Sequence, residues 1–396
     1  MGRPQLRLNM DRRGFLTFLA ALAARPAFAD DFSAFVATLR GPASEAGVAD
    51  ALFDSVAGGL SQDPSLTGKR AGQGEFTRPL KTYVEDAASP GRVKAGRDSQ
   101  AKNGPAVAAA ARATDVSVEM IVALWGMESD FGRARGDRDI FRTLATLAFL
   151  HRDNPVYAQE FVAGLVLLQK GLPREKLKGS WAGAMGDPQF MPSAYLKYAK
   201  SASGGMPDIW TAPDALLSIG NFLRESGWVQ GLAPLIETRT PENFDYATLK
   251  QDFSAWRAAG FKTLDGGALP RQGVAMLFYP AGASGPAFLL SENFFVLKAY
   301  NFSDSYAFAA AVLAERLAGR TVLRQPWPVE TQPLTQAERE AIQRGLVARG
   351  LYDGKIDGRF GPITRFAIHA FQRGSGVAEA DGFPSRAVFE LLRANP

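Results

Sequence analysis

Residues 118–132 read VEMIVALWGMESDFG, and the spacing of their apolar side chains predicts a helix. The apolar stripe of that helix comprises Val118, Ile121, Val122 and Trp125. Glu128 continues the stripe, so a carboxyl group points where apolar side chains go. Burial and the negative end of the helix both disfavour the ionised form, and we therefore expect a raised pKa for Glu128.

A glutamic acid that stays protonated near neutral pH suits glycosidic cleavage, because it can protonate the leaving oxygen. Two other interpretations of Glu128 are open on periodicity alone. The carboxylate would reach solvent from a frayed last turn, or it would pair with a structural arginine such as Arg133. Asp130 is expected to be an exposed residue at the helix end.

A second segment, GSWAGAMGDPQFMPS at residues 179–193, packs Gly and Ala between aromatic side chains. Small residues let a ligand approach the backbone closely, and Ser180 and Gln189 offer neutral hydrogen bonds that suit hydroxyl and acetamido groups. With the aromatic faces, these features indicate a sugar-binding pocket. The alternative is a tightly packed loop that ends in a proline turn.

Composition excludes several kinds of site. The 396 residues include no Cys, which rules out thiol catalysis, disulfides and Cys-based zinc sites. The two histidines, His151 and His369, fall in different predicted domains, so we expect no metal and no cofactor, and we expect His369 on a helix surface.

The net charge gives no sign of a nucleic-acid partner. Lys and Arg total 45 against 40 Asp and Glu, but residues 1–29 hold five Arg and one Asp. The remainder is nearly neutral, and no nucleic-acid partner is expected.

Residues 1–29 are interpreted as a signal peptide. Arg12-Arg13 precedes a short apolar stretch, and Ala27-Phe28-Ala29 is typical of a cleavage site. The arginine pair favours the twin-arginine export route. The apolar stretch is shorter than the ~20 residues of a spanning helix, and no Cys follows it to carry a lipid. The mature protein is therefore expected to be soluble and periplasmic.

The remaining chain divides into two predicted domains and a linker. Residues 30–323 have mainly helical periodicity with a small β-containing insertion, in which residues 274–279 and 286–290 are suited to strands. Residues 324–334 form a proline-rich, semi-rigid linker. The expected fold class is mainly α, of the α+β type.

Residues 335–396 are predicted to form a small separate domain. Thr335 and Glu338 make a capping box, which predicts a helix through Ala348. Pro362 suits the first turn of a second helix. These signals indicate a unit of three helices.

Taken together, the motifs of the first domain resemble the B-type lytic murein transglycosylase family, which are bacterial cell-wall enzymes with a lysozyme-like helical core. The similarity extends over residues 33–320 and rests on several motifs in one order. The motifs are residues 123–132, 144–148, 179–192, 227–228, 293–294 and 299–301.

The resemblance implies that Glu128 is the sole catalytic acid and base. It would cleave the β-1,4 bond between N-acetylmuramic acid and N-acetylglucosamine of peptidoglycan without water, and leave a 1,6-anhydro sugar. Two alternatives stay open. One is a muramidase that admits water, and the other is a catalytically silent scaffold that binds peptidoglycan.

The same resemblance implies roles for other residues. Ser180 would be a hydrogen-bonding neighbour of the reacting sugar and of the catalytic acid, Gln189 would orient the bound glycan, and Met185 would support the loop. The residues expected to line the cleft are Phe190, Phe222, Tyr300 and Asn301.

The chain also departs from the family pattern. Phe222 stands where a tyrosine is common, and Asp187 replaces an uncharged residue. His151-Arg152 stands where the family commonly has a pair of arginines. Some family members bind calcium in a loop that corresponds to residues 200–208. This loop supplies one carboxylate, Asp208, whereas a hard cation needs several, so we expect no calcium.

The C-terminal unit resembles the peptidoglycan-binding domain of many wall enzymes. A tethered module of this kind raises the effective concentration of an insoluble polymer. The expected partners are peptidoglycan glycan strands, and cell-wall synthesis or divisome proteins are further candidates. The chain is expected to act as a monomer.

Overall fold

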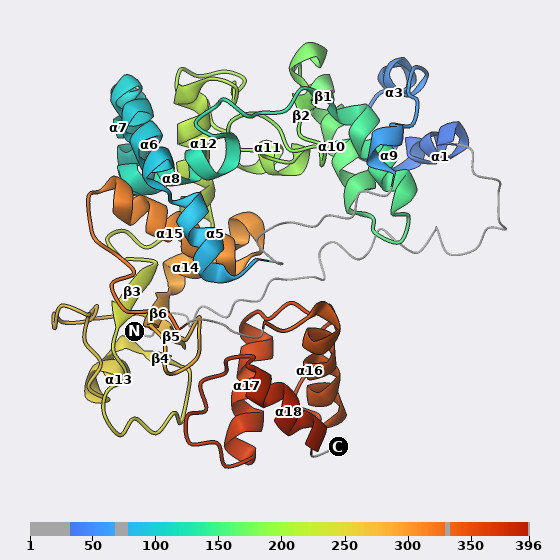
Figure 1. The fold of residues 1–396 in the computed structure, drawn as a ribbon. Helices are drawn as coiled ribbons and strands as arrows, with labels where there is room; N and C mark the ends of the chain where they lie inside the picture. Colours follow the sequence, from blue (N-terminus) through green and yellow to red (C-terminus); the bar gives the residue numbers. More distant parts are fainter. Residues whose placement is uncertain (1–31, 68–77, 329–332, 395–396) are drawn as a thin grey trace, which may run out of the picture.

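A computed structural model describes residues 32–67, 78–328 and 333–394. The predicted signal peptide lies outside these residues. None of the helices in the described part has the length and hydrophobicity that crossing a bilayer requires. Figure 1 shows a helical part, a β-containing part below it and a C-terminal helical module beside the latter. The expectation of a mainly helical α+β fold is confirmed.

The helical part is assembled from segments on both sides of the β-containing part. Its N-terminal helices are α1 (Phe32–Thr38), α2 (Arg40–Glu45), α3 (Asp50–Ala57), η2 (Pro64–Leu66), α5 (Leu80–Ala87), α6 (Pro90–Lys102), α7 (Gly104–Thr114) and α8 (Val118–Ser129). The central segments are β1 (Arg138–Asp139), α9 (Ile140–Leu150), α10 (Val156–Gln169), η3 (Arg174–Lys176), β2 (Lys178–Gly179), α11 (Pro192–Tyr198) and α12 (Ala212–Glu225). Two later helices return to it, α14 (Glu292–Asn301) and α15 (Asp304–Leu317).

Helix α8 packs against α6, α7, α12 and α15. Every residue from Met120 to Gly126 is buried, which goes beyond the single stripe predicted from the sequence. The reason is that α8 has neighbours on several sides, and a helix that is apolar all round is enclosed by protein. Ser117 caps its first turn, because its hydroxyl accepts a hydrogen bond from the Met120 N–H at 3.3 Å.

The β-containing part is an antiparallel sheet in the order β3-β6-β5-β4. Its strands are β3 (Leu235–Thr238), β4 (Lys250–Asp252), β5 (Val274–Phe278) and β6 (Ala287–Ser291). β5 and β6 confirm the two predicted strands. Because side chains alternate along a strand, Met276 and Phe278 join the helical core, while Ala275 and Leu277 join a second core with α13 (Phe253–Ala258). Both faces of the sheet are therefore covered.

The C-terminal module consists, within the described residues, of α16 (Gln336–Ala348), α17 (Pro362–Gly374) and α18 (Arg386–Ala394). Thr335 and Glu338 form the predicted capping box, with both reciprocal hydrogen bonds present. Pro362 occupies the first turn of α17, as predicted. The expectation of a three-helix unit is confirmed.

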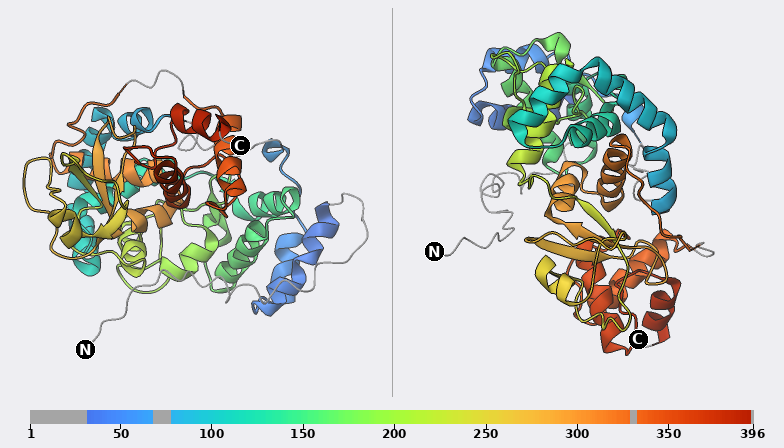
Figure 2. Two further views of the ribbon diagram at one scale, coloured as in Figure 1. Left: turned by 90° about the horizontal axis from the view of Figure 1, so that it is seen from below. Right: turned by 90° about the vertical axis from the view of Figure 1, so that its left-hand side faces the viewer.

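The module also packs directly against the β-containing part (Figure 2). Ala380 is buried in the second core, and the Asp381 carboxylate accepts a hydrogen bond from the Ala283 N–H at 2.8 Å. His369 differs from expectation: it lies at this interface, with Nε2 2.8 Å from the carbonyl oxygen of Tyr246. The module is thus attached by an interface as well as by the linker.

Glu338 makes the stability of the module depend on pH. Its carboxylate accepts hydrogen bonds from Arg386 of α18 and from Thr335, and these bonds lower the pKa of Glu338 to about 2. A lowered pKa stabilises the fold above the ordinary value of 4.5, and this contribution is lost as the pH falls toward 2. We expect Glu338→Gln to lower the thermal stability of the module at about pH 7, with a deficit that shrinks below about pH 4.

Thermal unfolding of the full chain, followed by circular dichroism across this pH range, measures the deficit. Glu390→Gln is the control, because Glu390 pairs with Arg393 at 3.6 Å on the exposed surface of the module. An equal deficit for Glu338→Gln at both ends of the range would contradict the assignment.

Candidate active site

Glu128 lies in the last turn of α8 and is partly buried. The helix ends at Ser129, and Asp130 takes the left-handed conformation at φ 50°. Arg133, a candidate partner of Glu128 in the sequence, pairs with Asp130 instead, with Nη2 and Oδ2 2.9 Å apart. The interpretation that Arg133 neutralises Glu128 is therefore wrong.

The phenol of Tyr306 donates a hydrogen bond to Oε1 of Glu128. Tyr306 lies in the first turn of α15, where the hydroxyl of Ser303 caps the helix by accepting the Tyr306 N–H at 3.2 Å. Burial raises the pKa of Tyr306 well above its ordinary value, and the charge of Glu128 raises it further. The phenol therefore keeps its proton and serves as a donor to the carboxyl group.

Aromatic side chains from four segments meet next to Tyr306. The ring of Tyr300 stacks on that of Tyr306, with centroids 6.5 Å apart and an angle of 17° between the ring planes. Tyr300 also lies 4.6 Å from Phe222 and 6.0 Å from Phe190 between ring centroids. The structure thus brings together three of the residues predicted to line the cleft, and it adds Tyr198, whose ring centroid is 4.6 Å from that of Phe222.

These rings pack mainly on each other. Phe190 is 3% exposed and Phe222 is 9% exposed. The hydroxyl of Tyr300 donates to the carbonyl oxygen of Pro188 at 2.8 Å, which ties α14 to the loop at residues 179–192. The aromatic cluster therefore supports the Glu128 end of α8 and holds the loop beside it.

The loop at residues 179–192 folds as a series of short antiparallel contacts. Gly179 pairs with Arg138 across β1 and β2, and isolated bridges join Gly179 to Met185 and Met185 to Phe190. Met185 is fully buried, in agreement with a supporting role. A Cβ on Gly179 would lie 2.1 Å from the carbonyl oxygen of Ala184, so this crossing of the backbone requires glycine.

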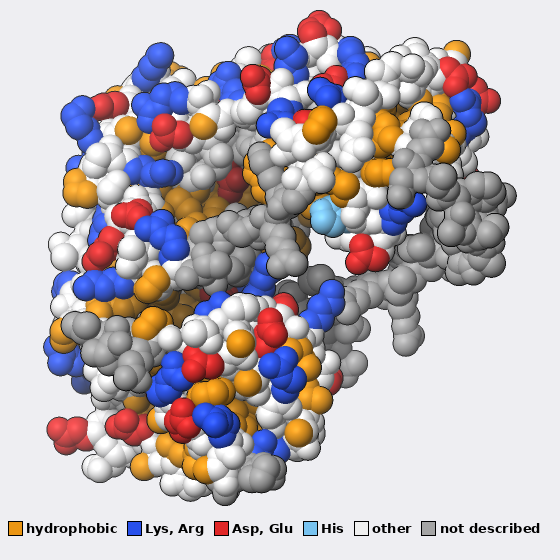
Figure 3. Space-filling view, turned by 45° about the vertical axis from the view of Figure 1, so that its right-hand side comes forward, with side chains coloured by type: hydrophobic (Ala, Val, Ile, Leu, Met, Phe, Trp, Pro, Cys, Tyr) orange, Lys and Arg blue, Asp and Glu red, His pale blue; other side chains and the backbone are white. Residues whose placement is uncertain are grey.

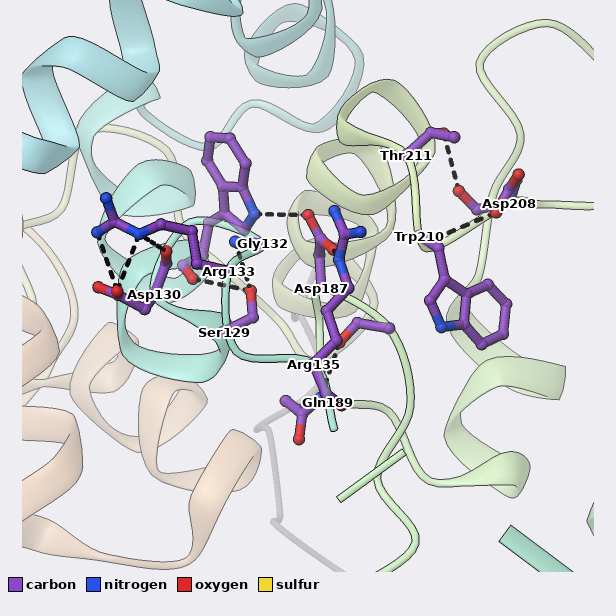
Figure 4. Close-up of polar contacts among 12 residues, drawn as sticks. Ser129, Asp130, Gly132, Arg133, Arg135, Asp187, Gln189, Asp208, Trp210 and Thr211 are labelled. Carbon is purple, nitrogen blue, oxygen red and sulfur yellow. Dashed lines mark hydrogen bonds and ion pairs between the residues drawn. The ribbon is translucent and has the colours of Figure 1, made fainter. Parts of the chain in front are cut away.

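Ser180 and Gln189 have structural partners within or beside the loop. The Ser180 hydroxyl accepts the N–H of Ala184 at 3.2 Å. The amide nitrogen of Gln189 donates to the carbonyl oxygens of Arg135 at 3.0 Å and Gly186 at 2.8 Å. Figure 4 shows Gln189 beside Arg135. Both amide hydrogens of Gln189 are therefore used, and its carbonyl oxygen is the atom that can face a ligand.

Asn301 and Arg152 occupy different surroundings. Asn301 is the last residue of α14, directly after Tyr300, and within the described residues its side chain makes no hydrogen bond. Arg152 lies over the rings of Phe149 at 4.4 Å and Phe35 at 5.4 Å. Its guanidinium thus packs on aromatic residues of α9 and α1.

Two further carboxyl groups near the loop are buried, and each has partners. Glu160 of α10 accepts hydrogen bonds from the N–H of Ser193 at 2.9 Å and from its hydroxyl at 2.6 Å. Burial raises the pKa of Glu160, and these hydrogen bonds oppose the rise. Asp187 pairs with Arg135 and accepts the indole N–H of Trp125 at 2.8 Å. Both carboxyl groups hold segments of the chain together.

The loop at residues 200–208 is held by hydrogen bonds to Asp214 and by an ion pair. The carboxylate of Asp214 in α12 accepts the N–H groups of Ala202 at 2.8 Å and Asp208 at 2.6 Å. Asp208 pairs with Lys176. In the described part of the chain, no three acidic, His or Cys side chains are grouped as metal ligands.

The arrangement can exchange a proton with a bound molecule. Glu128 is partly buried, and one of its oxygens is held by a neutral phenol, so its orientation is defined. On the face drawn in Figure 3, hydrophobic side chains gather in a hollow in the left half of the view. A positioned carboxyl group beside aromatic and small residues is suited to general acid and base chemistry.

Sequence reasoning missed Tyr306 and Tyr198. Tyr306 follows Tyr300 by six residues, across the serine that caps α15. The motif series stopped at residue 301, and no sequence pattern pairs a residue of α15 with one 178 positions earlier. The signal available was a tyrosine in the first turn of a helix whose next eight residues are apolar and rich in alanine, where a buried phenol needs a partner.

Comparison with known proteins places these residues in a family. Residues 31–315 match the family described as "Transglycosylase SLT domain", and residues 335–392 match a "Putative peptidoglycan binding domain". Membrane-bound lytic murein transglycosylase B of Escherichia coli (strain K12) is 32% identical over 208 residues, which are 51% of this chain and 57% of that protein. The chain thus spans little more than half the length of this curated relative.

Solved structures are similar over a larger share of the chain. SltB3 from Pseudomonas aeruginosa, in complex with NAG-anhNAM-pentapeptide, is 36% identical with a TM-score of 0.83, covering 92% of this chain and all of that one. The Escherichia coli lytic transglycosylase Slt35 in complex with calcium is 26% identical with a TM-score of 0.60, covering 72% of this chain and 92% of that one. Since the family match covers most of the chain, the protein belongs to the transglycosylase SLT domain family.

Proposed function

We propose that this protein is a lytic murein transglycosylase, which cleaves the β-1,4 bond between N-acetylmuramic acid and N-acetylglucosamine of peptidoglycan and forms a 1,6-anhydro sugar. One observation carries the proposal. Glu128, at the end of a buried helix in a transglycosylase family domain, is held by the neutral phenol of Tyr306.

In the proposed reaction Glu128 acts twice. As an acid it gives its proton to the glycosidic oxygen while the bond from that oxygen to C1 of the muramic acid breaks. As a base it then takes the proton of the C6 hydroxyl while that oxygen forms a bond to C1. No water is consumed and Glu128 recovers its proton, so a single carboxyl group completes the cycle.

The partners of two buried carboxyl groups beside the loop at residues 179–192 support a mechanism with one acid. Two-carboxylate hydrolysis needs a second acid that activates water or attacks the sugar. Glu160 accepts two hydrogen bonds from Ser193, and Asp187 pairs with Arg135 and Trp125. These carboxyl groups are occupied in structural roles, which favours transglycosylation over the muramidase alternative.

The remaining site residues have proposed roles in binding the glycan. Ser180 and the carbonyl oxygen of Gln189 would hydrogen-bond to sugar hydroxyl or acetamido groups. The rings proposed to line the path of the glycan are those of Phe190, Phe222 and Tyr300, with Asn301 beside them. Phe222 has no hydroxyl, so it contributes packing and no hydrogen bond.

The proposed substrate is peptidoglycan glycan strands in the periplasm. The related SltB3 structure holds a NAG-anhNAM-pentapeptide, and the C-terminal module matches a peptidoglycan-binding domain. Export through the predicted signal peptide at residues 1–29 would deliver the chain to this substrate. We propose that it acts as a monomer, with cell-wall synthesis or divisome proteins as candidate partners.

We expect Glu128→Gln to fold and to bind isolated peptidoglycan, but to release no anhydromuropeptides, because the amide can neither donate nor accept the required proton. Mass analysis of the products from purified wall measures this. Glu119→Gln is the control, since Glu119 lies in the first turn of the same helix. Full activity of Glu128→Gln would refute the assignment, and products with reducing ends from the unmodified chain would indicate a hydrolase.

We expect Tyr306→Phe to lower kcat by about 10- to 100-fold with little change in KM, because a hydrogen bond to a carboxylate is worth about 1.5–3 kcal/mol. The substitution removes the hydrogen bond from the phenol to Oε1 of Glu128, whereas the glycan contacts remain. Release of soluble fragments from wall glycans gives both constants. Tyr157→Phe serves as the control on α10, and an unchanged kcat for folded Tyr306→Phe would contradict the role of the phenol.

A further inference from the structure

Asp187 is a charged residue with no exposed surface, in the loop at residues 179–192. Its two carboxylate oxygens have different partners. Oδ2 accepts the indole N–H of Trp125 at 2.8 Å, and Oδ1 accepts the Nε–H of Arg135. Its backbone N–H donates to the carbonyl oxygen of Ile209 at 2.9 Å. Asp187 therefore joins α8, the segment after α8 and the segment before α12.

A second hydrogen bond connects the loop to the segment that follows α8. Gln189, two residues after Asp187, donates to the carbonyl oxygen of Arg135 at 3.0 Å. Arg135 is thus held by its side chain through Asp187 and by its backbone through Gln189. Figure 4 shows the side chains of Asp187 and Arg135 facing each other, with Gln189 at the backbone of Arg135.

The backbone at Gly132 packs tightly against the ion pair of Asp187 and Arg135. A Cβ on Gly132 would lie 2.7 Å from Oδ2 of Asp187 and 2.8 Å from Nη2 of Arg135. Gly132 also has φ 83°, a conformation that side chains of L residues rarely adopt. The chain after α8 therefore passes close against the ion pair, and glycine is required there.

The burial of this pair distinguishes it from an ordinary surface ion pair. The side chain of Asp187 is 0% exposed and that of Arg135 is 38% exposed. A fully buried carboxylate without its partner is strongly unfavourable, so the position of Asp187 depends on Arg135 and Trp125 remaining where they are. The pair thus fixes the distance between α8 and the loop more firmly than an exposed pair could.

Trp125 precedes Glu128 by three residues on α8, which is nearly one helical turn. We infer that Asp187 is a positioning residue: through Trp125 and Arg135 it holds the turn that carries Glu128 against the loop that carries Ser180 and Gln189. The kinetic part of this inference rests on the proposed transglycosylase function. Displacements of about 1 Å between reacting groups can cost about 100-fold in rate, so such a link matters for turnover.

The test uses Asp187→Asn and Arg135→Met in the full chain. Asn can still accept the indole N–H but carries no charge for Arg135, and Met replaces the aliphatic part of Arg135 and keeps its backbone contact with Gln189. We expect each variant to lower kcat on a soluble peptidoglycan fragment by about 10- to 100-fold, with KM changed less than about threefold. The double variant should lower kcat no further than the more severe of the two single variants does, because both substitutions break the same link.

A second measurement does not depend on activity. Hydrogen–deuterium exchange at residues 126–132 and 179–192 should increase in both single variants. The matched control is Glu338→Gln, which breaks the ion pair of Glu338 with Arg386 in the C-terminal module, away from both segments. It should lower thermal stability without the loss of kcat or the added exchange at these two segments.

The outcomes separate this inference from the proposed function. Unchanged exchange in Asp187→Asn, or wild-type kcat in the folded variants, overturns the positioning role. If Asp187→Asn does not fold, Arg135→Lys decides the question, because Lys keeps a positive charge beside the buried carboxylate but lacks the Nε–H that Oδ1 accepts. An unmodified chain that yields no anhydro product refutes the proposed function, and the exchange measurement still decides whether Asp187 holds the two segments together.

Discussion

Helix α8 is enclosed by other helices along the two turns that precede Glu128, and this burial determines where the carboxyl group lies. Ile121, Val122 and Leu124 are fully buried, and each such side chain contributes roughly 1.5–3 kcal/mol when removed from water. A shift of α8 along its axis would expose these side chains or force them into their neighbours. The position of Glu128 is therefore a consequence of core packing rather than of local sequence.

Hydrogen bonds orient the last turn of α8 within the position that core packing gives the helix. The end of α8 meets two polar groups from distant parts of the chain, the phenol of Tyr306 and the carboxylate of Asp187. Buried polar groups of this kind are costly unless they are satisfied, so each contact specifies one geometry. The site combines an apolar helix, which excludes alternative positions, with a few hydrogen bonds that orient its last turn.

The β-containing part links this site to the C-terminal module. One face of its sheet contributes to the core that contains α8 and α15, and the other face builds the second core, which includes Ala380 of the module. The interface through Ala380, Asp381 and His369 gives the module a defined orientation relative to the β-containing part.

The sequence by itself determined the local features: the helix that carries Glu128, two strands of the sheet, the capping box at Thr335 and the glycine-rich loop. Each of these depends on contacts within a few residues, which spacing reveals. The tertiary structure decided the partners of the site, because the Tyr306–Glu128 contact spans 178 residues and Asp187 meets Trp125 across 62. In the tertiary structure the amide hydrogens of Gln189 bond to backbone carbonyl oxygens, and His369 lies at an interface. Such contacts depend on how helices pack in space, and the periodicity of apolar residues along the chain does not predict that packing.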